Sequence, residues 1–146
     1  MDDLLKVLYV DDSKSDLVFF GIAAERAEGV GIWLQTSMDG KEAIEVLEGI
    51  GQYSDRSMYP IPEVVVLDWK MPVLSGEDFL LWHRSSEFYR LPVVMLSDSI
   101  DPEERRRASE LGASAFLQKP FSLQDWEDVV TRIFGMGVRH RQLAQA

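Results

Sequence analysis

The chain has 146 residues, a formal net charge of −10 at pH 7 and no cysteine. This length suits a single domain, and the lack of cysteine excludes disulfides, thiolate metal sites and cysteine nucleophiles. The excess of acidic residues argues against direct binding of nucleic acids, because such binding depends on cations that neutralise phosphates. No apolar stretch approaches the roughly 20 residues that cross a bilayer, so we expect a cytoplasmic protein without a membrane partner.

Short apolar runs recur along the chain and predict strands. They lie at residues 5–10, 63–67, 92–96 and 115–117, with 32–34 as a weaker candidate for an edge strand. Their hydrophobicity is continuous rather than alternating, which is typical of parallel strands covered by helices on both faces. Helix-length segments alternate with the runs, at about 14–28, 40–50, 76–87, 102–111 and 122–135. This alternation predicts an α/β fold with a doubly wound, five-stranded parallel sheet.

The ends of the helices and the longest connection add detail to this organisation. Candidate N-caps are Ser13, Asp39, Asp101 and Ser122.

The connection at 51–62 is long for a compact domain, so it is either a partner-binding element or a tolerated surface insertion. We expect a domain of residues 1–135 and a tail of residues 136–146 that frays or extends the last helix.

Polar residues follow four of the predicted strands at the point where each strand ends. They are Asp11-Asp12 after the first run, Asp68 after the third, Ser97 after the fourth and Lys119 after the fifth. Ligands of such sheets bind at the carboxyl ends of the strands, so we expect these side chains to share one edge of the sheet. Crowded carboxylates repel one another unless a cation sits among them, and an all-oxygen site suits Mg²⁺ or Mn²⁺.

A carboxylate beside a divalent cation and an ammonium is arranged for phosphoryl transfer. Catalysis of that reaction is mostly positioning and neutralisation of charge on the transferring oxygens. Asp68 is the candidate nucleophile, and its attack on phosphorus would form an acyl phosphate. Lys119 would supply positive charge opposite the metal, and Ser97 would donate a hydrogen bond to a phosphoryl oxygen.

This combination resembles the receiver domain of response regulators, the phosphoacceptor half of two-component signalling. The resemblance spans residues 5 to about 135 and rests, in chain order, on Asp11-Asp12, Asp68 with Met71-Pro72, Ser97, Phe116 and Lys119-Pro120. It implies a flavodoxin-like receiver fold with strand order 2-1-3-4-5 and a cis peptide bond before Pro120. It also implies a stand-alone signalling module that is not an enzyme, apart from intrinsic autodephosphorylation.

The resemblance assigns roles around the acceptor. Asp12 and Asp68 would bind Mg²⁺ or Mn²⁺ together with the backbone carbonyl of Lys70, and Asp11 would help through a water molecule. Asp68 would take its phosphoryl group from a histidine kinase, a histidine phosphotransfer protein or a small phosphodonor.

In the family, the arriving phosphoryl group operates a switch. Ser97 would move toward the phosphoryl group, and Phe116 would turn inward to fill the vacated space, while Lys119 binds a phosphoryl oxygen. The surface formed by the fourth helix, the fifth strand and the fifth helix would change as a result. A downstream protein would read that surface, and a homodimer is an alternative to the monomer.

Three residues lie where the resemblance implies tuning of the acyl phosphate. Asp98 follows Ser97 where receivers usually carry a small residue, and its charge would repel or crowd the phosphoryl group. Lys70 and Ser99 stand two residues after Asp68 and Ser97, at positions that affect the lifetime in the family. We therefore expect a nonstandard lifetime, with its direction left open.

Other functions and pathways stay open from the sequence. A receiver-like adaptor would work without phosphorylation, with Asp98 blocking the chemistry. A Mg²⁺-dependent aspartyl phosphatase would also use a nucleophile after a parallel strand, but it generally needs a second acid at the position of Lys70. The long connection at 51–62 resembles regulators associated with phytochrome kinases, whereas the run 68–72 resembles the chemotaxis type.

Overall fold

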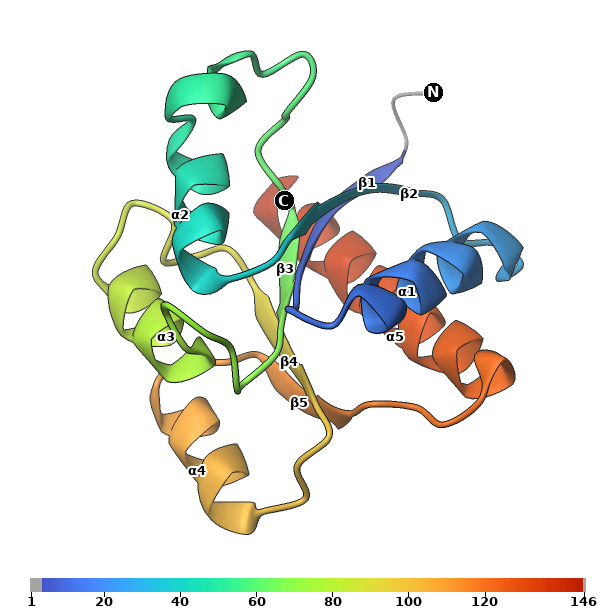
Figure 1. Cartoon of the computed structure of the whole chain (residues 1–146). Coiled ribbons are helices and arrows are strands. Elements are labelled where there is room, and N and C mark those ends of the chain that lie inside the picture. Colours follow the sequence, from blue (N-terminus) through green and yellow to red (C-terminus); the bar gives the residue numbers. More distant parts are fainter. Residues whose placement is uncertain (1–3, 146) are drawn as a thin grey trace.

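The computed structural model describes residues 4–145 and contains a five-stranded parallel sheet with the strand order β2-β1-β3-β4-β5 (Figure 1). The strands are β1 (Leu5–Val10), β2 (Ile32–Ser37), β3 (Val64–Leu67), β4 (Val93–Ser97) and β5 (Ala115–Gln118). The helices are α1 (Lys14–Arg26), α2 (Gly40–Glu48), the 3-10 turn η1 (Gly51–Ser54), α3 (Gly76–Arg84), α4 (Pro102–Glu110) and α5 (Leu123–Gln145). The predicted fold class and strand order are confirmed.

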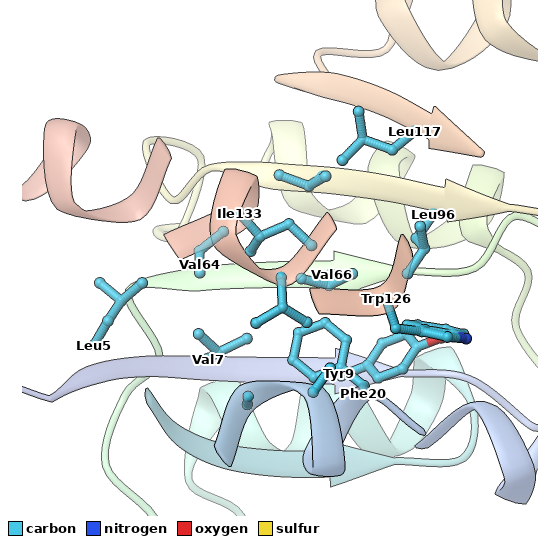
Figure 2. Close-up of a cluster of buried hydrophobic side chains, with 14 residues drawn as sticks. Leu5, Val7, Tyr9, Phe20, Val64, Val66, Leu96, Leu117, Trp126 and Ile133 are labelled. Atoms are coloured by element: carbon cyan, nitrogen blue, oxygen red, sulfur yellow. The ribbon is translucent and has the colours of Figure 1, made fainter. Parts of the chain in front are cut away.

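Helices cover both faces of the sheet, which explains why the strand sequences are apolar without alternation. Figure 1 shows α1 and α5 on one face and α2, α3 and α4 on the other. On the α1–α5 face, Val7 and Tyr9 of β1 pack with Phe20 of α1 and Trp126 of α5 (Figure 2). Their neighbours Leu8 and Val10 point into the second core with residues of α2 and α3. Both cores therefore hold the same strands in place.

The predicted start signals of the helices are present. The side chains of Ser13, Asp39 and Asp101 accept hydrogen bonds from the first turns of α1, α2 and α4. Ser122 accepts a hydrogen bond from the backbone N–H of Asp125 in the same way. A further cap of this kind, Ser75 of α3, was not among the predicted ones.

The C-terminal segment extends the last helix as far as Gln145. Two contacts anchor this extension. The guanidinium of Arg141 donates to both carboxylate oxygens of Glu63 at 2.6 Å, and Glu63 is the residue directly before β3. Gly137 lies against Leu5, and a Cβ at Gly137 would come within 2.5 Å of Leu5 Cδ2. Within residues 4–145 the structure contains no helix with the length and apolar character that a membrane crossing requires.

The long connection between α2 and β3 is ordered by one arginine. Arg56 donates to the carbonyl oxygens of Val46 and Leu47 in the last turn of α2, both at 2.7 Å. Tyr53 and Tyr59 pack edge to face in the same segment. The connection is therefore a structured part of the α2 side of the molecule.

Candidate functional site

The register of the sheet brings polar residues together at its carboxyl edge. Val10 is paired with Leu67, so Asp11 and Asp68, which follow these residues, emerge side by side. A pocket of about 500 Å³ opens at this edge. It is lined by Asp11, Asp12, Ser13, Asp16, Asp68, Lys70, Ser97, Asp98, Ser99 and Lys119. All the residues that the sequence suggested for the site therefore line one pocket, except Phe116.

Asp11 is completely buried and is held by three donors. Its Oδ2 accepts hydrogen bonds from the hydroxyl of Tyr9 at 2.7 Å and from Lys119 Nζ at 2.8 Å. Its Oδ1 accepts from the backbone N–H of Ser13 at 2.9 Å. Burial and the charge of Asp11 raise the pKa of Tyr9, so the phenol stays protonated and keeps donating.

Lys119 is the buried cation of the pocket. Its Nζ lies 2.8 Å from Asp11 Oδ2, 2.8 Å from Asp16 Oδ2 and 3.5 Å from Asp68 Oδ2. Burial by itself lowers the pKa of Lys119, but hydrogen bonds to Asp11 and Asp16 and the charge of Asp68 raise it overall. The side chain is therefore an ammonium shared by three carboxylates.

Asp68 is a buried acid of the pocket and lies farther from Lys119 than Asp11 and Asp16 do. It is 7% exposed, and burial together with the charge of Asp11 raises its pKa to about 6, against the opposing effect of Lys119. The loop after it is tightly packed, since a Cβ at Gly76 would lie 2.7 Å from the carbonyl oxygen of Asp68. The backbone N–H of Gly76 also donates to the carbonyl oxygen of Trp69. Asp68 is thus a fixed carboxylate that is mostly ionised at neutral pH.

Three carboxylates form a candidate cation site within the pocket. Asp11, Asp12 and Asp68 each offer an oxygen atom, and these atoms lie within 4.8 Å of one another. Asp12 is exposed, so water can complete the coordination shell from the solvent side. An all-oxygen set with open positions is what Mg²⁺ and Mn²⁺ prefer, and the donor set fits the predicted metal.

The other predicted residues lie at different depths. Ser97 is buried at the end of β4, and its Oγ accepts a hydrogen bond from the backbone N–H of Ser99 at 3.2 Å. Asp98 is an exposed part of the pocket wall. Phe116 is half-buried and faces α4, where the guanidinium carbon of Arg105 lies 4.9 Å from its ring centroid. Arg105 also donates to the carbonyl oxygen of Phe116 at 3.1 Å.

Two residues of the site and one peptide bond differ from the sequence-based expectations. Neither Asp16 nor Tyr9 was predicted to contact the site. Asp16 lies in the first turn of α1, where acids are common because of the helix dipole, so its residue type alone is no specific signal for the site. The predicted cis bond before Pro120 is wrong, because the described residues have no cis peptide bond. Even before proline the trans form is favoured, by roughly 0.5–1 kcal/mol.

Comparisons with known proteins agree with this geometry. The family model of the response regulator receiver domain matches residues 7–131. The probable methanogenesis regulatory protein FilR2 of Methanothrix harundinacea (strain 6Ac) is 31% identical over 135 residues, covering 90% of this chain and 83% of that protein. Several other curated relatives are longer, and the chain spans less than half of their length.

Two solved structures share the fold over most of their length. The phosphorylated cyanobacterial phytochrome response regulator RcpA has a TM-score of 0.79 and 27% identity, with 89% of this chain and 91% of that chain covered. The Mn²⁺-bound form of the response regulator Rcp1 has a TM-score of 0.76 and 26% identity, with 88% and 91% covered.

Proposed function

Because the chain belongs to the response regulator receiver domain family of two-component signalling, we propose that it accepts a phosphoryl group on Asp68 and signals through contact with another protein. One observation carries the proposal. A buried ammonium, Lys119, lies 2.8 Å from Asp11 and 3.5 Å from Asp68, in a pocket where Asp11, Asp12 and Asp68 also offer a cation site. With a cation bound at that site, Asp68 would have positive charge on two sides, which suits transfer of an anionic group.

The proposed reaction uses the ionised carboxylate of Asp68 as the nucleophile. One of its oxygens attacks the phosphorus of a phosphohistidine, or of a small phosphodonor, and an O–P bond forms as the bond from phosphorus to the donor breaks. Lys119 binds one oxygen of the transferred group, and the hydroxyl of Ser97 donates to another. We propose a histidine kinase or a histidine phosphotransfer protein as the donor, and the product is an acyl phosphate.

We propose that Asp12 and Asp68, with the backbone carbonyl of Lys70, hold a Mg²⁺ or Mn²⁺ ion. The ion would neutralise charge on the carboxylates and on the phosphoryl oxygens. Asp11 would support it through water, because Tyr9, Ser13 and Lys119 already donate to its two oxygens. The Mn²⁺-bound form of Rcp1, a protein of the same fold, supports this choice of metal.

We propose that the output surface is formed by α4, β5 and α5. Ser97 would move toward the phosphoryl group and Phe116 would turn inward. The packing of α4 supports this, because Ala108 is its one buried residue and a helix with little buried surface is easily displaced. The contacts of Arg105 with Phe116 tie this helix to β5, so a rotation of the ring changes the α4 surface.

A phosphoryl mimic tests the proposed function directly. Beryllium fluoride with Mg²⁺ is expected to shift backbone amide resonances of residues in the pocket and also in α4, β5 and the adjoining side of α5, as measured by NMR. The controls are beryllium fluoride without Mg²⁺ and the Asp68→Asn variant, which should show no such response. If wild type showed no shifts, or shifts confined to the pocket, the chain would be a phosphorylation-independent adaptor instead.

We propose that Asp98, Lys70 and Ser99 tune the rates of this chemistry. Asp98 adds a negative charge to the pocket wall, and Lys70 Nζ lies 3.9 Å from Glu104 Oε2, linking the loop after β3 to α4. Asp98→Asn removes a charge that repels an anionic donor, so we expect this variant to be phosphorylated by acetyl phosphate several-fold faster than wild type. Decay of the acyl phosphate is expected to change in Lys70→Asn.

Both rates are measured by intact mass spectrometry over time. The matched control is Asp128→Asn, which removes an acid of α5 outside the pocket and should leave both rates unaltered. Rates for Asp98→Asn and Lys70→Asn that equal those of wild type would refute the assigned tuning roles.

A further inference from the structure

Lys119 lies closer to an acid on α1 than to the proposed acceptor. The distance from Nζ to Asp16 Oδ2 is 2.8 Å, whereas the distance to Asp68 Oδ2 is 3.5 Å. Asp16 belongs to the first turn of α1, where its backbone N–H donates to the capping hydroxyl of Ser13. The carboxylate of Asp16 therefore reaches across the pocket from a helix that supplies none of the three clustered oxygen donors.

The ammonium has three N–H donors, and three carboxylates face it. A phosphoryl group on Asp68 also requires one of these donors. The donor that faces Asp68 makes the longest of the three contacts, at 3.5 Å, whereas a charge-assisted hydrogen bond to a phosphoryl oxygen is about 2.7–2.9 Å long. Binding of the phosphoryl group therefore favours a shift of the ammonium toward Asp68 and away from one of its two closer partners.

The two short contacts differ in how readily they can be broken. Asp11 has a side chain that is 0% exposed, so losing its ammonium partner would leave a buried charge without water to replace the bond. Asp16 has a side chain that is 21% exposed and can take up water instead. Asp16 is therefore the partner that can exchange its hydrogen bond from Lys119 for one from water.

We infer that Asp16 is a positioning residue that holds Lys119 toward α1 in the unphosphorylated protein and releases it to the phosphoryl group. The inference rests on the proposed function and names a competitor for Lys119 that this function does not require. Competition of this kind weakens binding of the phosphoryl group at Asp68. Neutralising Asp16 removes the competitor without shortening the side chain.

The first measurement compares beryllium fluoride affinity at saturating Mg²⁺ in wild type, Asp16→Asn and Glu25→Gln. Glu25 is an exposed acid of the same helix that does not line the pocket, so its substitution makes the same change in net charge. Asp16→Asn is expected to bind about fivefold more tightly, which is the order expected for a partly exposed ion pair. Glu25→Gln should bind like wild type, and the affinity of Asp16→Asn for Mg²⁺ alone should not rise.

The second measurement is a crystal structure of wild type with Mg²⁺ and beryllium fluoride. Lys119 Nζ is expected within hydrogen-bond distance of a fluorine and beyond hydrogen-bond distance of Asp16. An unchanged contact between Lys119 and Asp16, or an Asp16→Asn affinity no higher than that of wild type, overturns the inference and leaves the proposed function standing. If wild type itself does not bind beryllium fluoride in a Mg²⁺-dependent way, the proposed function fails.

Discussion

Asn in place of Asp68 is expected to abolish incorporation of a phosphoryl group from acetyl phosphate in the presence of Mg²⁺. The carboxamide keeps the size of the side chain but lacks the ionised oxygen that attacks phosphorus. Intact mass spectrometry measures the phosphorylated fraction of wild type and variant under identical conditions. Asp78→Asn, which changes an acid of α3 outside the pocket, is the control and should be phosphorylated like wild type. Equal labelling of wild type and Asp68→Asn would rule out Asp68 as the acceptor.

The same substitution is expected to stabilise the metal-free protein. Burial raises the pKa of Asp68 from 3.8 to about 6, so the folded state binds a proton more tightly than the unfolded state. The ionised carboxylate therefore costs stability, with the full cost above about pH 6 and none well below pH 4. Asn carries no charge and avoids this cost, although Lys119 loses one of its three partners.

Urea unfolding in the presence of a chelator measures the effect. At pH 7, Asp68→Asn should have a free energy of unfolding about 1–2 kcal/mol higher than wild type. The difference should shrink as the pH falls through about 6 toward 4, because wild-type Asp68 then becomes protonated. If Asp68→Asn raised the free energy of unfolding equally at pH 7 and pH 4, the ionisation of Asp68 would not be the cause of the stabilisation.

Lys119→Met is expected to cause the largest loss of stability among these variants. Methionine is of similar length but uncharged, so Asp11, Asp16 and Asp68 would lose their shared cation in a pocket where Lys119 is 5% exposed. Removing one partner of a buried ion pair typically costs about 3–5 kcal/mol. We expect about 3 kcal/mol at pH 7 in metal-free buffer, since Asp16 is accessible to water and Asp68 can take up a proton.

Mg²⁺ should restore part of this loss. A divalent cation replaces the missing positive charge, and ligand binding to the folded state adds stability in proportion to the logarithm of its concentration over Kd. Urea unfolding with and without Mg²⁺ should thus show a greater increase for Lys119→Met than for wild type. Lys41→Met, at an exposed lysine of α2, serves as the control and should unfold like wild type. A Lys119→Met protein as stable as wild type without metal would mean that the three acids do not depend on the ammonium.

The fold was predictable because apolar runs and helix-length segments alternate regularly along the whole chain. Continuous apolar runs indicated strands covered on two faces, and their alternation with helices left few topologies. The lengths of elements were less predictable. β2 extends to Ser37 although only residues 32–34 are apolar enough to indicate a strand, because pairing with β1 stabilises the polar part. The helix α5 continues to Gln145 because Arg141 reaches Glu63, a partner far away in sequence.

The sequence by itself determined which groups meet at the carboxyl edge of the sheet. Asp11, Asp68, Ser97 and Lys119 each mark the end of a predicted strand, and parallel strands of one sheet end at the same edge with neighbours about 4.8 Å apart, so these side chains share that edge. Only the tertiary structure decided which oxygen atoms the ammonium contacts. Asp16 and the hydroxyl of Tyr9 enter the site because α1 packs on β1 and α5 at one particular depth. Strand order fixes the positions of the residues at the strand ends to within a few ångströms. Hydrogen bonds depend on donor–acceptor distances that must be right to tenths of an ångström, and side-chain packing sets these distances.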